Sequence, residues 1–105
     1  MPATGGKLAT TELYDPATGR FSAGPALTAP RFKLPSAIAV VGEDVVVAGG
    51  AGSIERVRPG AESRAIATLA ARYYSTVTVV GDRLVVIGGY DDHAQTHDEI
   101  WSIAL

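Results

Sequence analysis

An internal repeat constrains this chain more than any other feature of its sequence. Residues 39–50 (AVVGEDVVVAGG) align without a gap with residues 78–89 (TVVGDRLVVIGG), at an offset of 39 positions. The dipeptide Arg31-Phe32 recurs as Arg72-Tyr73, 41 positions later. Fixed blocks with spacers of variable length indicate repeated structural units joined by loops of different length. Because one such unit cannot bury its own apolar faces, neighbouring units are expected to pack against each other.

Each repeat begins with two apolar segments that have the composition of β-strands. Residues 36–41 and 76–80 are rich in small and β-branched side chains, which fit a pleated surface. A glycine and two charged residues separate each of them from a second apolar run, residues 45–48 or 84–87. This pattern predicts two tight hairpins. Since both strands of each hairpin are apolar almost throughout, both faces are expected to be covered.

A more mixed segment follows each Gly-Gly pair and predicts a third strand. Residues 54–57 and 100–103 are these segments, and residues 13–14 hold the same place near the N-terminus, followed by a turn over residues 15–19. Residues 65–71 have the propensity of a helix, but the repeat frame assigns them to an outer strand.

Composition narrows the partners and the chemistry. Nine basic and eleven acidic side chains give a net charge of -2, which lacks the positive surplus that phosphate-backbone binding needs, so no nucleic-acid partner is expected. No apolar stretch approaches the roughly 18 residues of a spanning helix, so no membrane partner is expected either. The chain has no cysteine, which excludes disulfides and thiolate chemistry but leaves the cellular compartment open.

The order of these elements resembles the kelch repeat. Residues 12–21 (ELYDPATGRF), then Arg31-Phe32 and then residues 45–50 (VVVAGG), are similar to the repeats of bacterial kelch proteins related to the galactose oxidase propeller. The resemblance covers about residues 9–105. It implies an all-β fold of kelch-type β-propeller blades, each a four-stranded antiparallel sheet. The second unit departs from the pattern, because Val57-Arg58-Pro59 replaces its Tyr-Asp-Pro.

By this resemblance the chain forms an incomplete propeller of about 2 to 2.5 blades. Residues 1–8 are expected to be a flexible N-terminal segment, followed by a half blade (9–27), a full blade (31–70) and a three-stranded blade (72–105). The terminal blades would then leave apolar faces and strand edges uncovered. We therefore expect either that the chain is a piece of a longer propeller or that copies associate head to tail.

The resemblance also points to ligand-binding residues. It implies that Arg31 and Arg72 lie at one rim of the central channel, on the side of the loops that follow the Gly-Gly pairs. Two interpretations of these arginines remain open. They can bind a carboxylate of a ligand with their bidentate fork, or they can donate hydrogen bonds to backbone carbonyls between blades. Tyr73, Tyr74 and Tyr90 are expected to line the same mouth, with a place in the core as the alternative for Tyr74.

An acidic segment over residues 91–99 (DDHAQTHDE) holds both histidines and four of the eleven acidic residues. Its side chains are of the types that ligate divalent metals, and His93, His97 and Asp98 are the candidate ligands. The alternative is a solvated acidic loop, since spacing within a loop does not force side chains to converge.

These observations favour a binding or scaffolding module that presents propeller loops to a protein or carbohydrate ligand, with no catalysis of its own and no cofactor. The alternative is a fragment of a sugar-active kelch enzyme of the oxidase or epimerase type. The related oxidase of this family relies on a tyrosine cross-linked to cysteine. This chain has no cysteine and cannot form that centre by itself.

Overall fold

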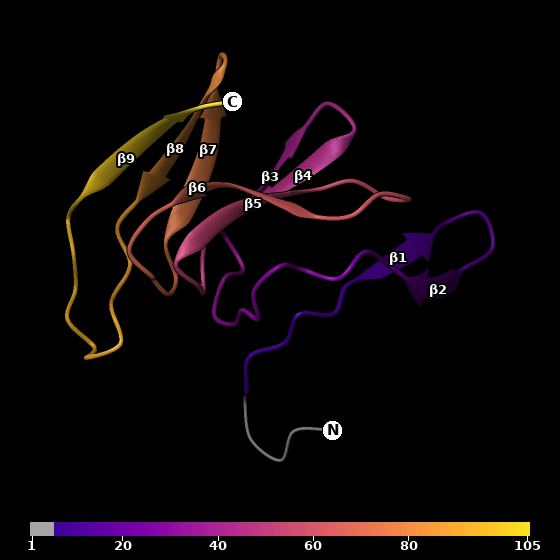
Figure 1. Ribbon diagram of the computed structural model, residues 1–105, viewed down its shortest axis with the longest axis horizontal. Helices are drawn as coiled ribbons and strands as arrows, with labels where there is room; N and C mark the ends of the chain where they lie inside the picture. The colour runs from indigo at the N-terminus through magenta and orange to yellow at the C-terminus, as the bar shows by residue number, and fades with distance from the viewer. Residues whose placement is uncertain (1–5) are drawn as a thin grey trace.

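The computed structural model describes residues 6–105, and its nine regular elements in that range are all β-strands (Figure 1). The strands form three antiparallel sheets of two, four and three strands, so the all-β fold with incomplete blades expected from the sequence is confirmed. The first sheet contains β1 (Glu12–Asp15) and β2 (Arg20–Ala23). The second contains β3 (Ile38–Val41), β4 (Asp44–Val47), β5 (Ser53–Val57) and β6 (Arg64–Thr68). The third contains β7 (Thr76–Val80), β8 (Arg83–Ile87) and β9 (Ile100–Ala104).

The N-terminal segment expected to be flexible, residues 1–8, falls largely outside the described residues, which exclude 1–5. At its described end, Leu8 exchanges two backbone hydrogen bonds with Arg31, at 2.8 and 3.1 Å. This pair joins the start of the described chain to the loop that precedes β3.

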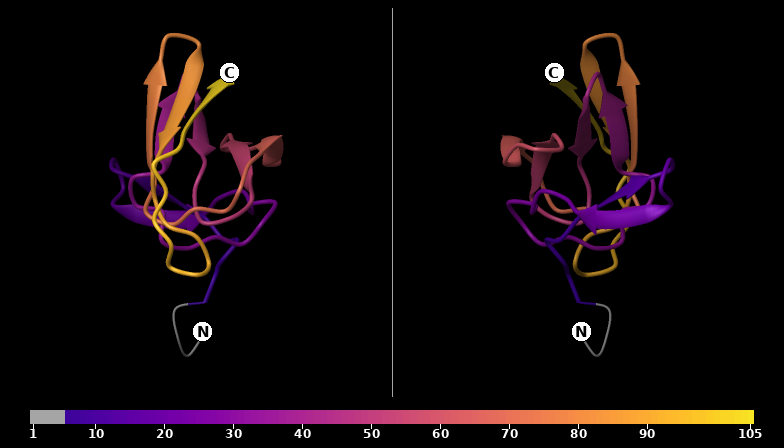
Figure 2. Two further views of the ribbon diagram at one scale, coloured as in Figure 1. Left: turned by 90° about the vertical axis from the view of Figure 1, so that its left-hand side faces the viewer. Right: turned by 90° about the vertical axis from the view of Figure 1, so that its right-hand side faces the viewer.

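The two repeats form equivalent hairpins, β3–β4 and β7–β8, which stand side by side in the views of Figure 2. Their β-branched residues suit the pleated sheet, and a two-residue turn closes each hairpin. The N–H of Val77 in β7 donates to the carbonyl of Ser36, two residues before β3, at 3.0 Å. The hairpins therefore fix the second and third sheets relative to each other.

The hydrophobic core lies between the second and third sheets. Its fully buried members are Val46, Ala48 and Ile54 from the second sheet and Leu84 and Val86 from the third. Side chains that pack around them include Trp101 of β9. The core is thus an interface between two repeat units, as expected for a fold whose units cannot bury their faces alone.

The opposite faces of these sheets are covered only in part, with Val47 buried but other positions exposed, which corrects the expectation that both faces of each hairpin are covered. Val40 in β3 is 73% exposed and Val80 in β7 is 60% exposed. The second and third sheets each cover one face of the other, and within the described residues no further sheet packs on the face that carries Val80. The continuous apolar composition of these strands indicates that both of their faces would be stable when buried. It does not indicate that both faces are buried.

The second glycine of each Gly-Gly pair allows the chain to approach itself closely. Gly50 has φ 77° and Gly89 has φ 95°, values in the left-handed region. A Cβ on Gly50 would clash with the backbone of Phe32, and one on Gly89 would lie 2.7 Å from the carbonyl oxygen of Tyr73. Both glycines therefore allow the loops before the inner strands to lie against the loops after the second strands.

Replacing Gly50 by alanine should lower the free energy of unfolding by about 2 to 4 kcal/mol, because it adds left-handed strain to a backbone clash. Gly52→Ala is the matched control, since its Cβ would meet only an ordinary contact at 3.5 Å. Chemical denaturation of both variants measures the difference. Equal stability of the two variants would contradict the close approach at Gly50.

Candidate functional site

Loops gather at one end of the molecule, opposite the tips of the inner hairpins (Figure 2). We call this the loop end, comprising residues 24–36, 48–52, 69–75 and 88–99. The N–H of Tyr74 donates to the carbonyl of Lys33 at 2.8 Å, and Tyr73 and Tyr90 exchange two hydrogen bonds at 2.9 and 3.0 Å. The loops of the second and third sheets therefore form one connected surface.

Arg31 is buried beneath this surface and paired with Glu55 of β5. Its Nε and Nη2 donate to Oε2 of Glu55 at 3.0 and 2.8 Å, and its Nη1 donates to the carbonyls of Gly49 and Ser53 at 3.0 and 2.7 Å. A further bond joins Nη2 to the hydroxyl of Ser53 at 2.9 Å. Every guanidinium nitrogen of Arg31, one of the two expected ligand-binding arginines, is therefore bonded within the chain.

Glu55 is fully buried and receives donors from two directions. Besides Arg31, the backbone N–H of Thr28 donates to its Oε1 at 2.7 Å. Burial alone would raise the pKa of this carboxyl, but the hydrogen bonds from Thr28 and Arg31 outweigh burial, so the pKa lies below its usual value. The ionised carboxylate consequently fastens the loop before β3 to the middle of the second sheet.

The third sheet repeats this arrangement in a more open form. Arg72, the counterpart of Arg31, donates from Nη2 to Glu99 at 3.2 Å and from Nη1 to the carbonyl of Ala71 at 2.9 Å. Its guanidinium also lies 5.3 Å from the ring centroid of Trp101. Glu99 is 47% exposed on its side chain, unlike the fully buried Glu55. Arg72 is itself buried, so little of this second arginine faces solvent.

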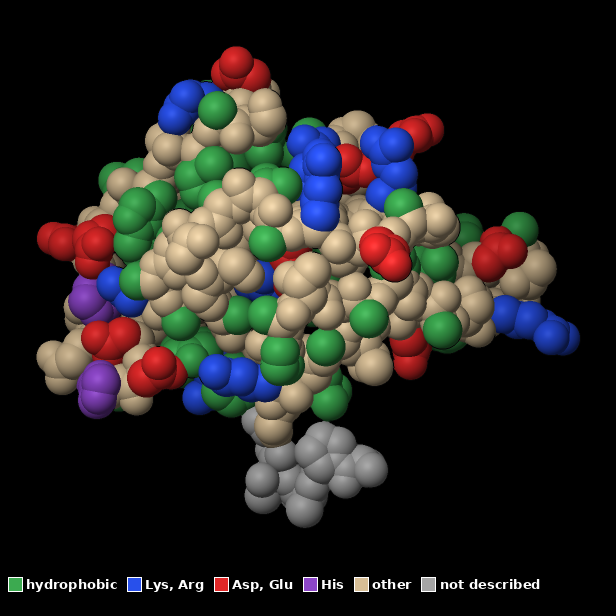
Figure 3. All heavy atoms as spheres, in the orientation of Figure 1, with side chains coloured by type: hydrophobic (Ala, Val, Ile, Leu, Met, Phe, Trp, Pro, Cys, Tyr) green, Lys and Arg blue, Asp and Glu red, His purple; other side chains and the backbone are tan. Residues whose placement is uncertain are grey.

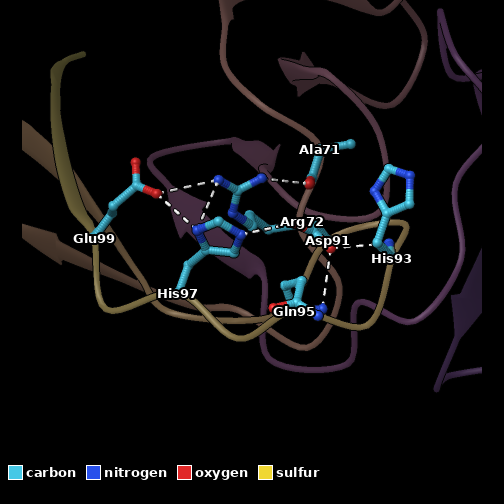
Figure 4. Close-up of polar contacts among 7 residues, drawn as sticks. All are labelled: Ala71, Arg72, Asp91, His93, Gln95, His97 and Glu99. Carbon is cyan, nitrogen blue, oxygen red and sulfur yellow. Dashed lines mark hydrogen bonds and ion pairs between the residues drawn. The ribbon is translucent and has the colours of Figure 1, made fainter.

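His97 is held between two carboxylates in the acidic loop (Figure 4). Its Nε2 lies 2.9 Å from a carboxylate oxygen of Asp91, and its Nδ1 lies 2.9 Å from one of Glu99. Both contacts are hydrogen bonds only when the ring carries two protons. The bond to His97 and the backbone N–H groups of Gln95 and His93 hold the pKa of Asp91 well below its usual range.

The three candidate metal ligands do not converge. His93 is exposed, with its ring turned away from His97 in Figure 4, and Asp98 is also exposed. Among residues 6–105 no group of three or more His, Asp or Glu side chains is arranged to hold a metal ion. The acidic side chains that do approach His97 are Asp91 and Glu99.

Four aromatic rings and two lysines form a connected patch, which we call the aromatic–lysine cluster. The rings of Phe32 and Tyr73 meet edge to face at 5.2 Å, and Tyr90 lies 5.8 Å from Tyr73. The Nζ of Lys33 lies 4.9 Å from the centroid of Phe32. Its members are Lys7, Phe32, Lys33, Tyr73, Tyr74 and Tyr90.

Polar contacts hold the buried ring at the middle of this cluster. The hydroxyl of Tyr73 donates to Asp92 and lies 3.3 Å from Nζ of Lys7. Lys7 and Lys33 both lie within about 6 Å of the rings of Phe32 and Tyr73, the range of a cation–π interaction. The expected residues Tyr73 and Tyr90 are thus brought together, in the company of two lysines.

Two residues of the cluster have left-handed backbones, which non-glycine residues seldom adopt. Lys33 has φ 56° and Tyr74 has φ 58°. They hold equivalent positions in the repeat, directly after Arg31-Phe32 and Arg72-Tyr73. Such strain costs of order 1 kcal/mol or more at each residue and is concentrated in binding and active sites.

Sequence reasoning missed Lys7, Phe32, Lys33 and Asp92 as members of the site. Extending the repeat alignment by one residue past Arg31-Phe32 would have drawn attention to Lys33, the counterpart of Tyr74. No sequence pattern indicates Lys7, because the Leu8–Arg31 pairing that positions it is visible only in the structure.

The cluster has the chemistry of a recognition surface. Large aromatic side chains supply contact area at small entropic cost, and the lysine ammonium groups supply positive charge. Within residues 6–105 there is no helix with the length and apolar character needed to span a lipid bilayer.

Comparison with known proteins agrees with this architecture. Residues 71–103, which run from Arg72 and its loop through β9, match the family model described as the kelch motif. No curated protein matches the chain.

Replacing Glu55 by glutamine should lower the free energy of unfolding near neutral pH by about 3 to 5 kcal/mol, because Arg31 keeps a buried charge without its partner. Since the pKa of Glu55 is lower folded than its unperturbed value of 4.5, the carboxylate stabilises the fold above that pH, and this contribution is lost as the pH falls through the folded pKa. The deficit of the variant should therefore shrink at about pH 3.

Urea denaturation at both pH values measures this deficit. Glu62→Gln, at an exposed position, is the control and should change stability by no more than about 0.5 kcal/mol. A Glu55→Gln deficit of the same size at both pH values would contradict the assigned role of the carboxylate.

Proposed function

We propose that this chain, in which residues 71–103 match the kelch motif, is a protein-binding module and that its loop end contacts the partner. The aromatic–lysine cluster is the contact surface. Phe32 and Tyr73 form its inner part, and Lys33 and Tyr74 its exposed part.

The observation that carries this proposal is the paired left-handed backbone of Lys33 and Tyr74. Tyr74 is 53% exposed even though it is a large aromatic residue. The hydrogen bond between these two residues fixes their spacing, so both side chains are held in place before a partner arrives. Preorganisation of this kind lowers the entropic cost of binding.

The charge of the cluster favours an acidic segment of a partner protein. Lys7 and Lys33 are exposed, and each has its ammonium group over aromatic rings. Figure 3 shows basic and hydrophobic side chains adjoining at the lower end of the molecule. A carboxylate that reaches this surface meets both ammonium groups, while the apolar parts of the partner meet Tyr74.

A protein ligand fits this surface better than a carbohydrate. Sugars bind aromatic side chains by stacking on a free ring face. Here the Nζ of Lys33 lies within 5.8 Å of the centroids of Phe32, Tyr73 and Tyr90, so lysine already covers faces of those rings. Tyr74 is the ring of the cluster without a lysine above it among these contacts.

Selection from a display library of random short peptides tests this function. The wild-type chain should enrich peptides rich in Asp and Glu. Lys33→Ala should weaken binding of the selected peptides about 30-fold, the effect of losing a hot-spot contact of about 2 kcal/mol. Arg20→Ala, which removes an exposed cation from β2, is the matched control and should bind as the wild type does.

Tyr74→Ala should weaken the same peptides without changing their preference for acidic residues. Peptides that bind Lys33→Ala and Tyr74→Ala as tightly as the wild type would rule out the loop end as the contact surface.

A further inference from the structure

An arginine-lined pocket of about 290 Å³ lies at the hairpin-tip end of the second sheet, away from the loop end. Its charged lining comes from the start of β4, the end of β5, the turn that follows and the start of β6, through Asp44, Arg56, Arg58, Glu62 and Arg64. In Figure 3 basic side chains flank an acidic one over this part of the molecule. Three arginines against two acidic residues leave the pocket with a positive surplus.

Asp44 is buried and fixes two of these arginines by one nitrogen each. Its Oδ2 accepts a hydrogen bond from Nε of Arg56 at 2.9 Å, and its Oδ1 accepts one from Nε of Arg58. The hydrogen bond from Arg58 holds the pKa of Asp44 below its usual value, so this carboxylate is ionised at neutral pH. Among the hydrogen bonds within residues 6–105, none involves the Nη groups of either arginine. Both guanidinium groups are therefore held in place with their Nη donors free for a ligand.

Arg64 brings a third guanidinium group, and this one has no partner in the described part of the chain. It lies directly opposite Arg56 in the antiparallel pairing of β5 and β6. Like charges in such a cross-strand pair destabilise a sheet. An anion that accepts hydrogen bonds from both arginines would turn this repulsion into attraction.

The third sheet has the same strand arrangement without this cluster. At the offset of 39, the counterpart of Asp44 is Arg83, which is of the opposite charge. Arg56 lies beside Val46 of β4, and Ser102 holds the corresponding place in β9. The fold of the sheet therefore does not require three arginines around one carboxylate at this end.

The position of the pocket favours a small ligand over another sheet. Cross-strand neighbours share one face, and Val46, beside Arg56, lies in the core between the second and third sheets. The pocket therefore opens on a face that already has its neighbouring sheet. Apart from Ala61 its lining is charged, which suits a polar ligand.

We propose that this pocket binds the phosphate group of a small phosphate monoester. Such a group carries close to two negative charges at neutral pH and has three free oxygens that point in different directions. It can therefore accept hydrogen bonds from all three guanidinium groups at once, and arginine suits phosphate because its fork donates two parallel bonds. A planar carboxylate has one charge and two oxygens, so it matches fewer of these donors. This site is separate from the protein contact at the loop end.

Calorimetric titration with methyl phosphate at a constant ionic strength of about 0.1 M tests this proposal. The wild-type chain should show saturable binding at one site, and methyl sulfate, which has one charge, should bind at least about 10-fold more weakly. Arg64→Gln should weaken methyl phosphate binding about 10-fold, the effect of losing one charge-assisted contact. Because the Arg64 side chain has no partner in the free structure, this variant should keep the thermal midpoint of the wild type.

Arg83→Gln is the matched control, since it removes an exposed arginine from the same end of the neighbouring sheet. It should bind methyl phosphate as the wild type does. Absence of saturable binding to the wild type, or equal affinity of the wild type and Arg64→Gln, would overturn the proposal. Equal affinity for methyl phosphate and methyl sulfate would overturn the assignment to a phosphate dianion.

Two further measurements test the charge and the source of the phosphate. Glu62 is an exposed acidic residue of the lining, so Glu62→Gln should tighten methyl phosphate binding about 2- to 3-fold, and weaker binding would contradict the proposal. Co-sedimentation with vesicles that contain phosphatidic acid separates a lipid headgroup from a free monoester. The wild-type chain should stay in the supernatant. Sedimentation that is lost in Arg64→Gln would assign the pocket to a lipid headgroup and overturn the small-ligand proposal.

Discussion

The buried ion pair between Arg31 and Glu55 is the interaction on which the loop end depends. It joins the loop before β3, the end of hairpin β3–β4 and strand β5 through one guanidinium and one carboxylate. Burying two charges is costly, and the cost is offset here because each nitrogen and each oxygen has a partner. The backbone of Arg31 also pairs with Leu8, which sets Lys7 beside Phe32.

Comparison of the two repeats shows how the buried pair of Arg31 and Glu55 differs from its counterpart, Arg72 and Glu99. Beside the third sheet, Arg72 and Glu99 hold the positions of Arg31 and Glu55, but Glu99 lies near the surface and contacts His97. No backbone N–H group from the preceding loop reaches Glu99 among the described contacts, in contrast to Thr28 at Glu55. In the first repeat, therefore, a buried ion pair joins the loop to the sheet. In the second repeat, the corresponding residues form an exposed polar network at the rim.

Much of the fold was predictable from the sequence, because strand pairing follows from local composition and the repeat. The hairpins around residues 42 and 81 and the third strands lie where the pattern indicated, and the outer strand expected over residues 65–71 spans residues 64–68. The partner of Arg31 was not predictable, since an arginine before an inner strand suits a ligand carboxylate as well as an internal one. The exposure of individual strand residues could not be predicted either. Val40 and Val79 hold the same repeat position, but Val40 is exposed and Val79 packs against the core.

Hydrogen exchange in an Arg31→Lys variant tests the central claim most directly, because lysine keeps the charge but loses the planar fork. Compared with the wild type, the amides of Leu8, Thr28 and position 31 should lose protection, whereas the amides of Leu84 and Val86 in β8 should keep theirs. Unchanged protection at Leu8 and Thr28 would contradict the claim that this ion pair holds the loop end together.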